Sequence, residues 1–121
     1  MNGFSVEFYE TPRGSFPAEE FILSQDNGMQ AKLYRLIELL ELKGSSLREP
    51  YSKSLGDGIF ELRANQGSQA ARVLYFFVIG KRVILTNGFM KKTQKTPARE
   101  LETAQRYRSD FLKREGGNDH D

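Results

Sequence analysis

The 121-residue chain contains no cysteine, and this absence removes several kinds of chemistry at once. It has no disulfide bonds, no thiolate nucleophile and no cysteine-ligated zinc site, which suits a reducing compartment. Its longest apolar run, residues 73–79, is too short to span a bilayer. The N-terminal residues lack the basic region and apolar run of a signal peptide. We therefore expect a soluble, cytoplasmic protein without a membrane partner.

Common catalytic signatures are also missing. The only histidine is His120, the penultimate residue, and its place between Asp119 and Asp121 is more typical of a tail than of a catalytic site. The sequence has no HExxH zinc motif, GxSxG nucleophile motif, GxGxxG dinucleotide motif or Walker loop. Its Asp and Glu residues do not gather with the spacing of metal ligands. The sequence thus predicts no metal site and no cofactor.

Positive charge is concentrated in the middle of the chain, although the formal net charge is only +2. Residues 1–42 hold three Lys or Arg and seven Asp or Glu, whereas residues 43–99 hold eleven Lys or Arg and three Asp or Glu. Such an excess favours a surface that binds an anionic partner. The alternative is that these cations only keep an ordinary surface in solution.

Hydrophobic periodicity predicts one α+β domain over residues 1–115 and a flexible tail over residues 116–121. A period of two indicates strands, and spacings of three and four indicate helices, in the order β-α-α-β-β-β-α. We expect a twisted antiparallel sheet with a two-helix hairpin packed on one face, and a C-terminal helix. The expected strands are residues 4–8, 59–64, 71–79 and 82–90; the expected helices run from Ser15 to Gln25, from Met29 to Leu40, and onward from an N-cap at Thr96.

The sequence also predicts which strand is central and where the longest loop lies. The strand at residues 71–79 is apolar on both faces, which predicts a central, covered strand and a core position for Tyr75. Residues 44–58 have no helical period and contain Pro50, Gly56 and Gly58, so we expect a loop there.

The strand order brings basic residues together. Arg63 and Arg72 flank one hairpin turn, so they lie near each other. The last strand returns to the start of the strand before it, so Lys91 and Lys92 at its exit approach Arg72, which shares a face with apolar neighbours. Lys53 lies in the segment that enters the sheet.

Cations packed together repel one another, so their convergence suggests an anionic ligand. The alternative is that they pair with Glu61 or with a helix carboxylate.

Three motifs of the chain resemble the RelE/HigB superfamily of toxins. They are KSLGDGIFELR at residues 53–63, ARVLYF at residues 71–76 and GFMKKTQKTP at residues 88–97. The last motif is similar to the branch called phage-derived Gp49-like or HigB-type proteins. The resemblance covers about residues 3–110.

This resemblance implies a type II toxin–antitoxin toxin that acts as a metal-independent mRNA interferase on ribosome-bound mRNA. Its partner would be an antitoxin, often a helix-turn-helix DNA-binding protein. In the implied reaction the RNA 2′-OH attacks the adjacent phosphate. Arg72 would hold the scissile phosphate, and the lysine pair would stabilise charge or act as acid. The expected catalytic residues are Arg72, Lys91, Lys92 and Arg63; the expected RNA-binding residues are Lys53, Arg48 and Lys95.

The general base stays unassigned. Some family members place a Tyr or His near the start of the last helix, but residues 93–99 hold neither. Crowding among cations lowers the pKa of a lysine, which would let a lysine serve as base.

Two alternatives belong to other classes of function. One is a ParE-like toxin that inhibits DNA gyrase without cleaving nucleic acid, which needs no cluster of catalytic cations. The other is a plain nucleic-acid-binding module, which the lack of an exposed aromatic platform makes less favoured.

Overall fold

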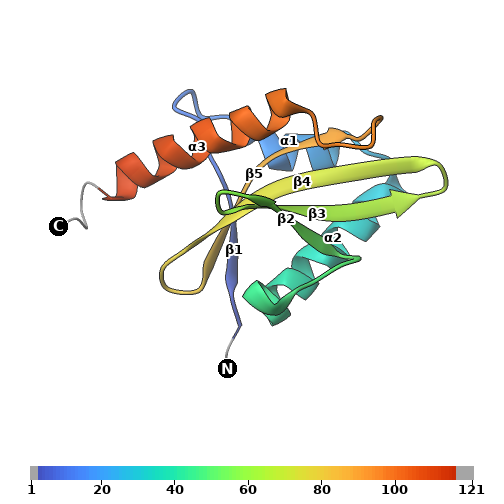
Figure 1. Cartoon of the computed structure of the whole chain (residues 1–121), viewed down its shortest axis with the longest axis horizontal. Helices are drawn as coiled ribbons and strands as arrows, with labels where there is room; N and C mark the ends of the chain where they lie inside the picture. Colours follow the sequence, from blue (N-terminus) through green and yellow to red (C-terminus); the bar gives the residue numbers. More distant parts are fainter. Residues whose placement is uncertain (1–2, 117–121) are drawn as a thin grey trace.

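Five strands, three α-helices and one turn of 3-10 helix make up residues 3–116, the part of the chain that the computed structural model describes (Figure 1). The elements are β1 (Ser5–Phe8), α1 (Pro17–Leu23), α2 (Asn27–Lys43), the 3-10 turn Gly44–Ser46, β2 (Ser52–Gly56), β3 (Ile59–Gln66), β4 (Gln69–Val78), β5 (Arg82–Met90) and α3 (Ala98–Gly116). The predicted tail lies outside the described residues from position 117 on, and so does His120. Among the described helices, none is both long and apolar enough to cross a membrane.

The strands form one mixed sheet in the order β1-β5-β4-β3-β2. Short turns join β2 to β3, β3 to β4 and β4 to β5, and all three pairs are antiparallel. The antiparallel pairing of β3 with β4 and of β4 with β5 is as predicted. β1 pairs with β5 in parallel, from Ser5 opposite Arg82 to Phe8 opposite Leu85, so a purely antiparallel sheet is wrong. The reason is that no tight turn joins β1 to β5, and only a tight turn forces neighbours to run in opposite directions.

The predicted loop over residues 44–58 contains a strand that the sequence did not reveal. β2 pairs with β3 from Ser52 opposite Leu62, and Asp57 and Gly58 take positive φ values of 54° and 80° in the turn between them. The Ser52 hydroxyl forms a buried hydrogen bond of 2.5 Å with the Tyr75 hydroxyl. The observed order is therefore β-α-α-β-β-β-β-α.

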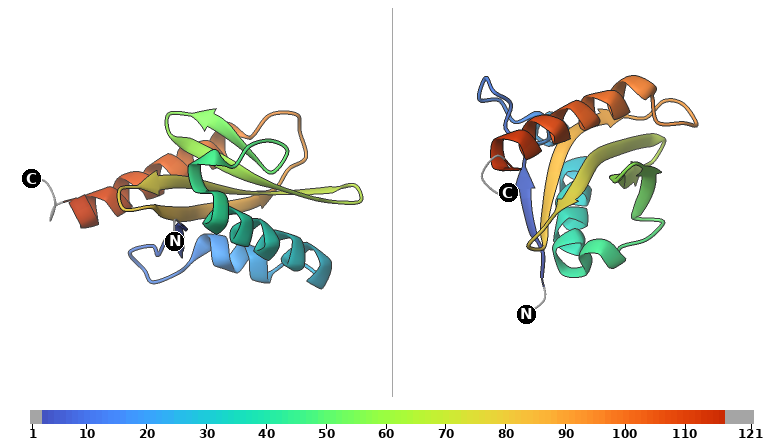
Figure 2. Two further views of the ribbon diagram at one scale, coloured as in Figure 1. Left: turned by 90° about the horizontal axis from the view of Figure 1, so that it is seen from below. Right: turned by 60° about the vertical axis from the view of Figure 1, so that its left-hand side comes forward.

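Helices cover both faces of the sheet (Figure 2). α1 and α2 lie on one face, where Leu33 and Leu40 pack with Leu62 of β3. α3 crosses the other face, where Leu74 and Phe76 of β4 are buried. The predicted helix pair on one face and the central, doubly apolar strand are confirmed; α3 is what covers the second apolar face of β4.

Two helix starts differ from the predicted caps. α1 begins at Pro17, because the Ser15 hydroxyl bonds to Thr11 instead of capping the helix. α3 begins at Ala98, because the Thr96 hydroxyl donates to Glu61 and the Pro97 carbonyl accepts the first helical hydrogen bonds. Thr96 thus binds the carboxylate of Glu61 instead of capping α3.

Candidate functional site: a basic recess at the β3–β4 hairpin

The sheet register brings the four predicted catalytic cations to one place. Arg63 of β3 lies directly opposite Arg72 of β4, and Arg72 lies opposite Phe89 of β5. The chain then leaves β5 with the Lys91 backbone N–H donating to the Ala70 carbonyl at 2.7 Å. Arg63 and Arg72 lie on the face of the sheet that α3 covers, beyond the start of that helix.

These cations line a hollow of about 640 Å³, which we call the basic recess. It is open to solvent, and its remaining lining comes from the β3–β4 turn, from the start of β4 and from the segment between β5 and α3. The lining residues are Arg63, Ser68, Ala70, Arg72, Lys91, Lys92, Thr93 and Gln94.

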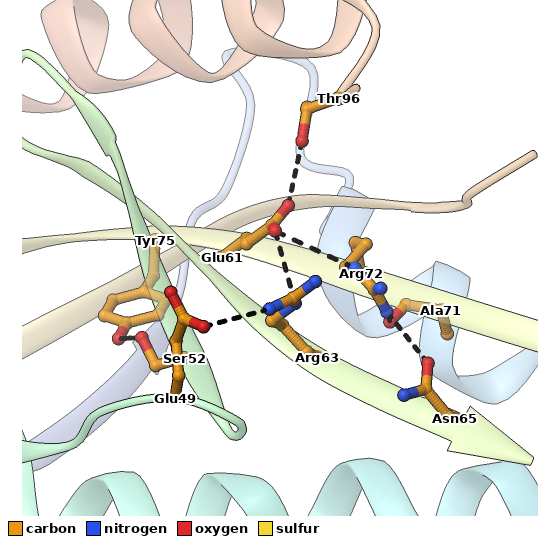
Figure 3. Close-up of polar contacts among 9 residues, drawn as sticks. All are labelled: Glu49, Ser52, Glu61, Arg63, Asn65, Ala71, Arg72, Tyr75 and Thr96. Carbon is orange, nitrogen blue, oxygen red and sulfur yellow. Dashed lines mark hydrogen bonds and ion pairs between the residues drawn. The ribbon is translucent and has the colours of Figure 1, made fainter. Parts of the chain in front are cut away.

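One buried carboxylate lies beside the recess. Glu61 is 1% exposed, and its Oε2 lies 3.5 Å from Arg63 Nε and 3.8 Å from Arg72 Nε (Figure 3). Its Oε1 accepts a 2.9 Å hydrogen bond from the Thr96 hydroxyl. The pairing with Glu61 that the sequence left open as an alternative therefore exists. Glu61 offers one negative charge to a cluster of four cations, so the recess keeps a positive charge.

The two arginines have unused hydrogen-bond donors. Arg63 Nε and Arg72 Nε are buried, and neither forms a hydrogen bond in the described structure, because their contacts with Glu61 are too long or poorly aligned. The Arg72 guanidinium is held in place by Nη1, which donates to Asn65 Oδ1 at 3.2 Å and to the Ala71 carbonyl at 2.9 Å (Figure 3). The nearest acceptor of both N–H groups is Glu61 Oε2, so this one carboxylate satisfies neither arginine fully.

Burial and neighbouring cations perturb two of the basic groups. Partial burial lowers the pKa of Lys91, and the charges of Arg72, Arg63 and Lys53 lower it further, against an opposing effect of Glu61. Burial also lowers the pKa of Arg72. Lys91 therefore loses its proton more readily than an ordinary lysine.

Two of the three predicted RNA-binding residues lie next to the basic recess, and the third does not. Lys53 and Lys95 line a smaller hollow of about 250 Å³ next to the basic recess, together with Lys91 and Glu61. Arg48 lines neither hollow. It lines a separate hollow together with residues of β2, and its Nη1 donates to the carbonyls of Ser45 and Leu47.

Comparison with known protein families identifies the chain. The model of the family described as "Phage derived protein Gp49-like (DUF891)" matches residues 20–109. The chain belongs to the Gp49-like family. This family is part of the RelE/ParE-like toxin superfamily of toxin–antitoxin systems, so membership indicates a toxin and implies a cognate antitoxin. No curated protein matches the chain.

Some residues of the Gp49-like site were not among the predicted site residues. From the sequence, Glu61 is only a possible partner of the cations, although its position two residues before Arg63 on one strand places both on the same face. The sequence predicts a helix cap for Thr96 and a turn for Asn65. Tyr75 was predicted as core, and this is confirmed, since it is buried on the opposite face.

Proposed function

We propose that this Gp49-like chain is a ribosome-dependent mRNA endonuclease of a type II toxin–antitoxin system, acting in the cytoplasm. The observation that carries the proposal is the basic recess, where four cations converge and two buried guanidinium N–H groups have no hydrogen-bond partner. A phosphate supplies the negative charge that this excess of cations needs.

In the proposed reaction, Arg72 and Arg63 bind the scissile phosphate. Their guanidinium groups would offer positive charge and N–H donors to the phosphorane oxygens, and fixed donors of this kind stabilise a transition state without reorganisation. The neighbouring Nη1 of Arg72 is already anchored by Asn65 and Ala71, so the guanidinium is held before the substrate arrives.

The lysines transfer the protons. Lys91 in its neutral form accepts the proton of the RNA 2′-OH, and the 2′-oxygen attacks the phosphorus. The bond from phosphorus to the 5′-oxygen breaks, and the ammonium of Lys92 gives that oxygen its proton. The products are a 2′,3′-cyclic phosphate and a 5′-OH, and no proton is gained or lost overall.

The partners follow from the same proposal. Lysines are weak proton-transfer groups, so the substrate must be well aligned, and ribosome-bound mRNA supplies that alignment. Lys53 and Lys95 contact the RNA backbone beside the scissile phosphate, and Arg48 contacts it farther away. The antitoxin is a helix-turn-helix DNA-binding protein.

The experiment compares variants in a translating extract, with mRNA ends mapped by primer extension. The variants are Arg72→Ala, Arg72→Lys and the double variant Lys91→Ala/Lys92→Ala. Matched controls remove an exposed cation far from the recess: Arg13→Ala for arginine, and Lys113→Ala for lysine. Circular dichroism verifies that each variant folds.

We expect cuts within ribosome-bound mRNA for the wild type and the controls, and none for the lysine double variant. This double variant is decisive because both lysines lie on a loop and contribute little to the hydrophobic core, so their loss should leave the fold intact. Intact mRNA with the wild-type chain, together with blocked DNA supercoiling, indicates a gyrase toxin and overturns the proposal. Intact mRNA with normal supercoiling overturns it as well.

A further inference from the structure

Lys91 lies between two hollows of the molecule. Its side chain lines the basic recess together with Arg63 and Arg72, and it also lines the smaller hollow of about 250 Å³ together with Lys53 and Lys95. In the described structure it is the one lysine that lines both hollows. An amine in this position lies next to any anion that the recess binds.

The backbone of Lys91 is fixed, whereas its amine is not engaged by a carboxylate. The backbone N–H donates to the Ala70 carbonyl at 2.7 Å, so the side chain starts from a defined place at the end of β5. Its Nζ forms no ion pair within the described residues. Glu61, which lines the smaller hollow with it, already contacts Thr96 and the two arginines. The amine is therefore available to a molecule that enters from solvent.

The surroundings of Lys91 favour the reactive form of its amine. Burial lowers the pKa of Lys91, and the charges of neighbouring cations lower it further. A larger fraction of the amine is then neutral, and the neutral amine is the form that attacks carbon. Lysines next to other cationic groups act as nucleophiles for this reason.

The charge of the recess selects which reagents reach this amine. Four cations against one buried carboxylate attract a compact anion, and guanidinium groups bind phosphoryl oxygens well. An electrophile that contains a phosphoryl group is therefore concentrated next to Lys91. In an acyl phosphate, a single oxygen separates the carbonyl carbon from phosphorus. A phosphoryl group held at the arginines thus keeps the carbonyl carbon next to a lysine of the same hollow.

We propose that Lys91 is a site of acylation by acyl phosphates, whose phosphoryl group binds at Arg63 and Arg72 in the basic recess. The neutral Nζ attacks the carbonyl carbon and forms a C–N bond. The bond from that carbon to the bridging oxygen breaks, and phosphate leaves with the electron pair and takes one proton from the nitrogen. The products are an amide on Lys91 and hydrogen phosphate. Acylation removes the positive charge of Lys91; a loss of mRNA cleavage on acylation rests on the proposed function, but the acylation itself does not.

The test measures the acetylation rate of each lysine in the full chain by peptide mass spectrometry, with acetyl phosphate as the reagent. N-hydroxysuccinimidyl acetate, which transfers the same acetyl group but contains no phosphate, is used in parallel. The ratio of the two rates at one lysine cancels the intrinsic reactivity of its amine, so it isolates the contribution of phosphate binding. Lys113, an exposed lysine of α3, is the comparison within each sample. The variant Arg63→Gln has Arg13→Gln, at an exposed arginine, as its matched control.

We expect the ratio at Lys91 to exceed the ratio at Lys113 at least about tenfold, because a bound reagent is held next to the amine. Arg63→Gln should lower the ratio at Lys91 at least about threefold, and Arg13→Gln should leave it unchanged. Inorganic phosphate should slow the acetylation of Lys91 by acetyl phosphate, but not that of Lys113, relative to chloride at the same ionic strength.

Three results overturn the proposal: equal ratios at Lys91 and Lys113, a ratio at Lys91 that Arg63→Gln does not change, or acetylation of Lys91 that inorganic phosphate does not slow. The competition by phosphate uses the wild-type chain, so it decides the question even where a variant fails to fold. None of these measurements involves RNA, so their failure and the failure of the cleavage assay are distinguishable.

Discussion

Replacing Glu61 by glutamine tests whether this carboxylate stabilises the cations of the basic recess. The substitution keeps the shape of the side chain and an oxygen for the Thr96 hydroxyl, but it removes the negative charge 3.5 Å from Arg63 Nε and 3.8 Å from Arg72 Nε. Arg72 is buried, so water solvates its charge poorly. Removing one partner of a buried ion pair costs roughly 3–5 kcal/mol.

We expect the lower end of that range, about 3 kcal/mol, because Arg63 is partly exposed and water screens its charge. For a chain of 121 residues the unfolding entropy corresponds to about 4 °C of melting temperature per kcal/mol, so Tm should fall by about 12 °C. Thermal unfolding followed by circular dichroism, and urea unfolding at pH 7, measure the loss. A domain of ordinary stability still folds after such a loss.

Glu49→Gln is the matched control for this prediction. It removes the same charge from the other carboxylate near Arg63, but Glu49 is 63% exposed and 3.9 Å away. We expect a loss below about 0.5 kcal/mol there. If Glu61→Gln and Glu49→Gln lowered stability equally, Glu61 would not be the group that offsets the buried cations, and the electrostatic account of the recess would be wrong.

Three further predictions concern separate parts of the molecule. If neutral Lys91 is the base, single-turnover cleavage of ribosome-bound mRNA should rise about tenfold per pH unit below the lowered pKa of Lys91 and then level off, whereas Lys91→Arg should lose this profile. Burial and the hydrogen bond to Asp110 raise the pKa of Tyr9 from 10.0 to about 12. The stability that this shift contributes is present below pH 10 and should be lost as the pH rises from 10 to about 12. Urea unfolding should show this loss for the wild type and not for Tyr9→Phe. Gly88→Ala should destabilise the fold by about 1–3 kcal/mol in urea unfolding, because the added methyl meets the Phe21 ring; an unchanged midpoint would contradict that packing.

The sequence predicted best those elements that local pattern determines. β5 has the predicted bounds, and β4 differs from its predicted bounds by two residues at its start and one at its end. β2 escaped because it is five residues long and rich in serine and glycine, so its own pattern is that of a loop. Its pairing with β3 and the Ser52–Tyr75 hydrogen bond are long-range interactions, which a local period does not record.

Register explains why the cations of the site were predictable and their partners were not. In a meander, each short turn fixes which strand ends lie side by side, and the end of the last strand lies beside the start of the strand before it. The sequence alone therefore predicts that Arg63, Arg72 and Lys91 lie close together. The same register puts Glu61 on their face, but it does not reveal which cation it contacts. Thr96 was missed as a partner because Thr-Pro before a helical stretch is a common start signal, and only the fold shows that Glu61 competes for its hydroxyl.

The position of Glu61 also bears on how strongly the recess binds phosphate. With both arginines near, one carboxylate offsets only part of their charge, so the recess keeps an excess of positive charge. Arg63→Gln removes one of these cations and leaves the charge of Glu61 paired with Arg72 alone. The attraction of the recess for a phosphate then falls while the repulsion by Glu61 is less well offset. Arg63→Gln should therefore weaken the binding of mRNA by more than the loss of one isolated cation would.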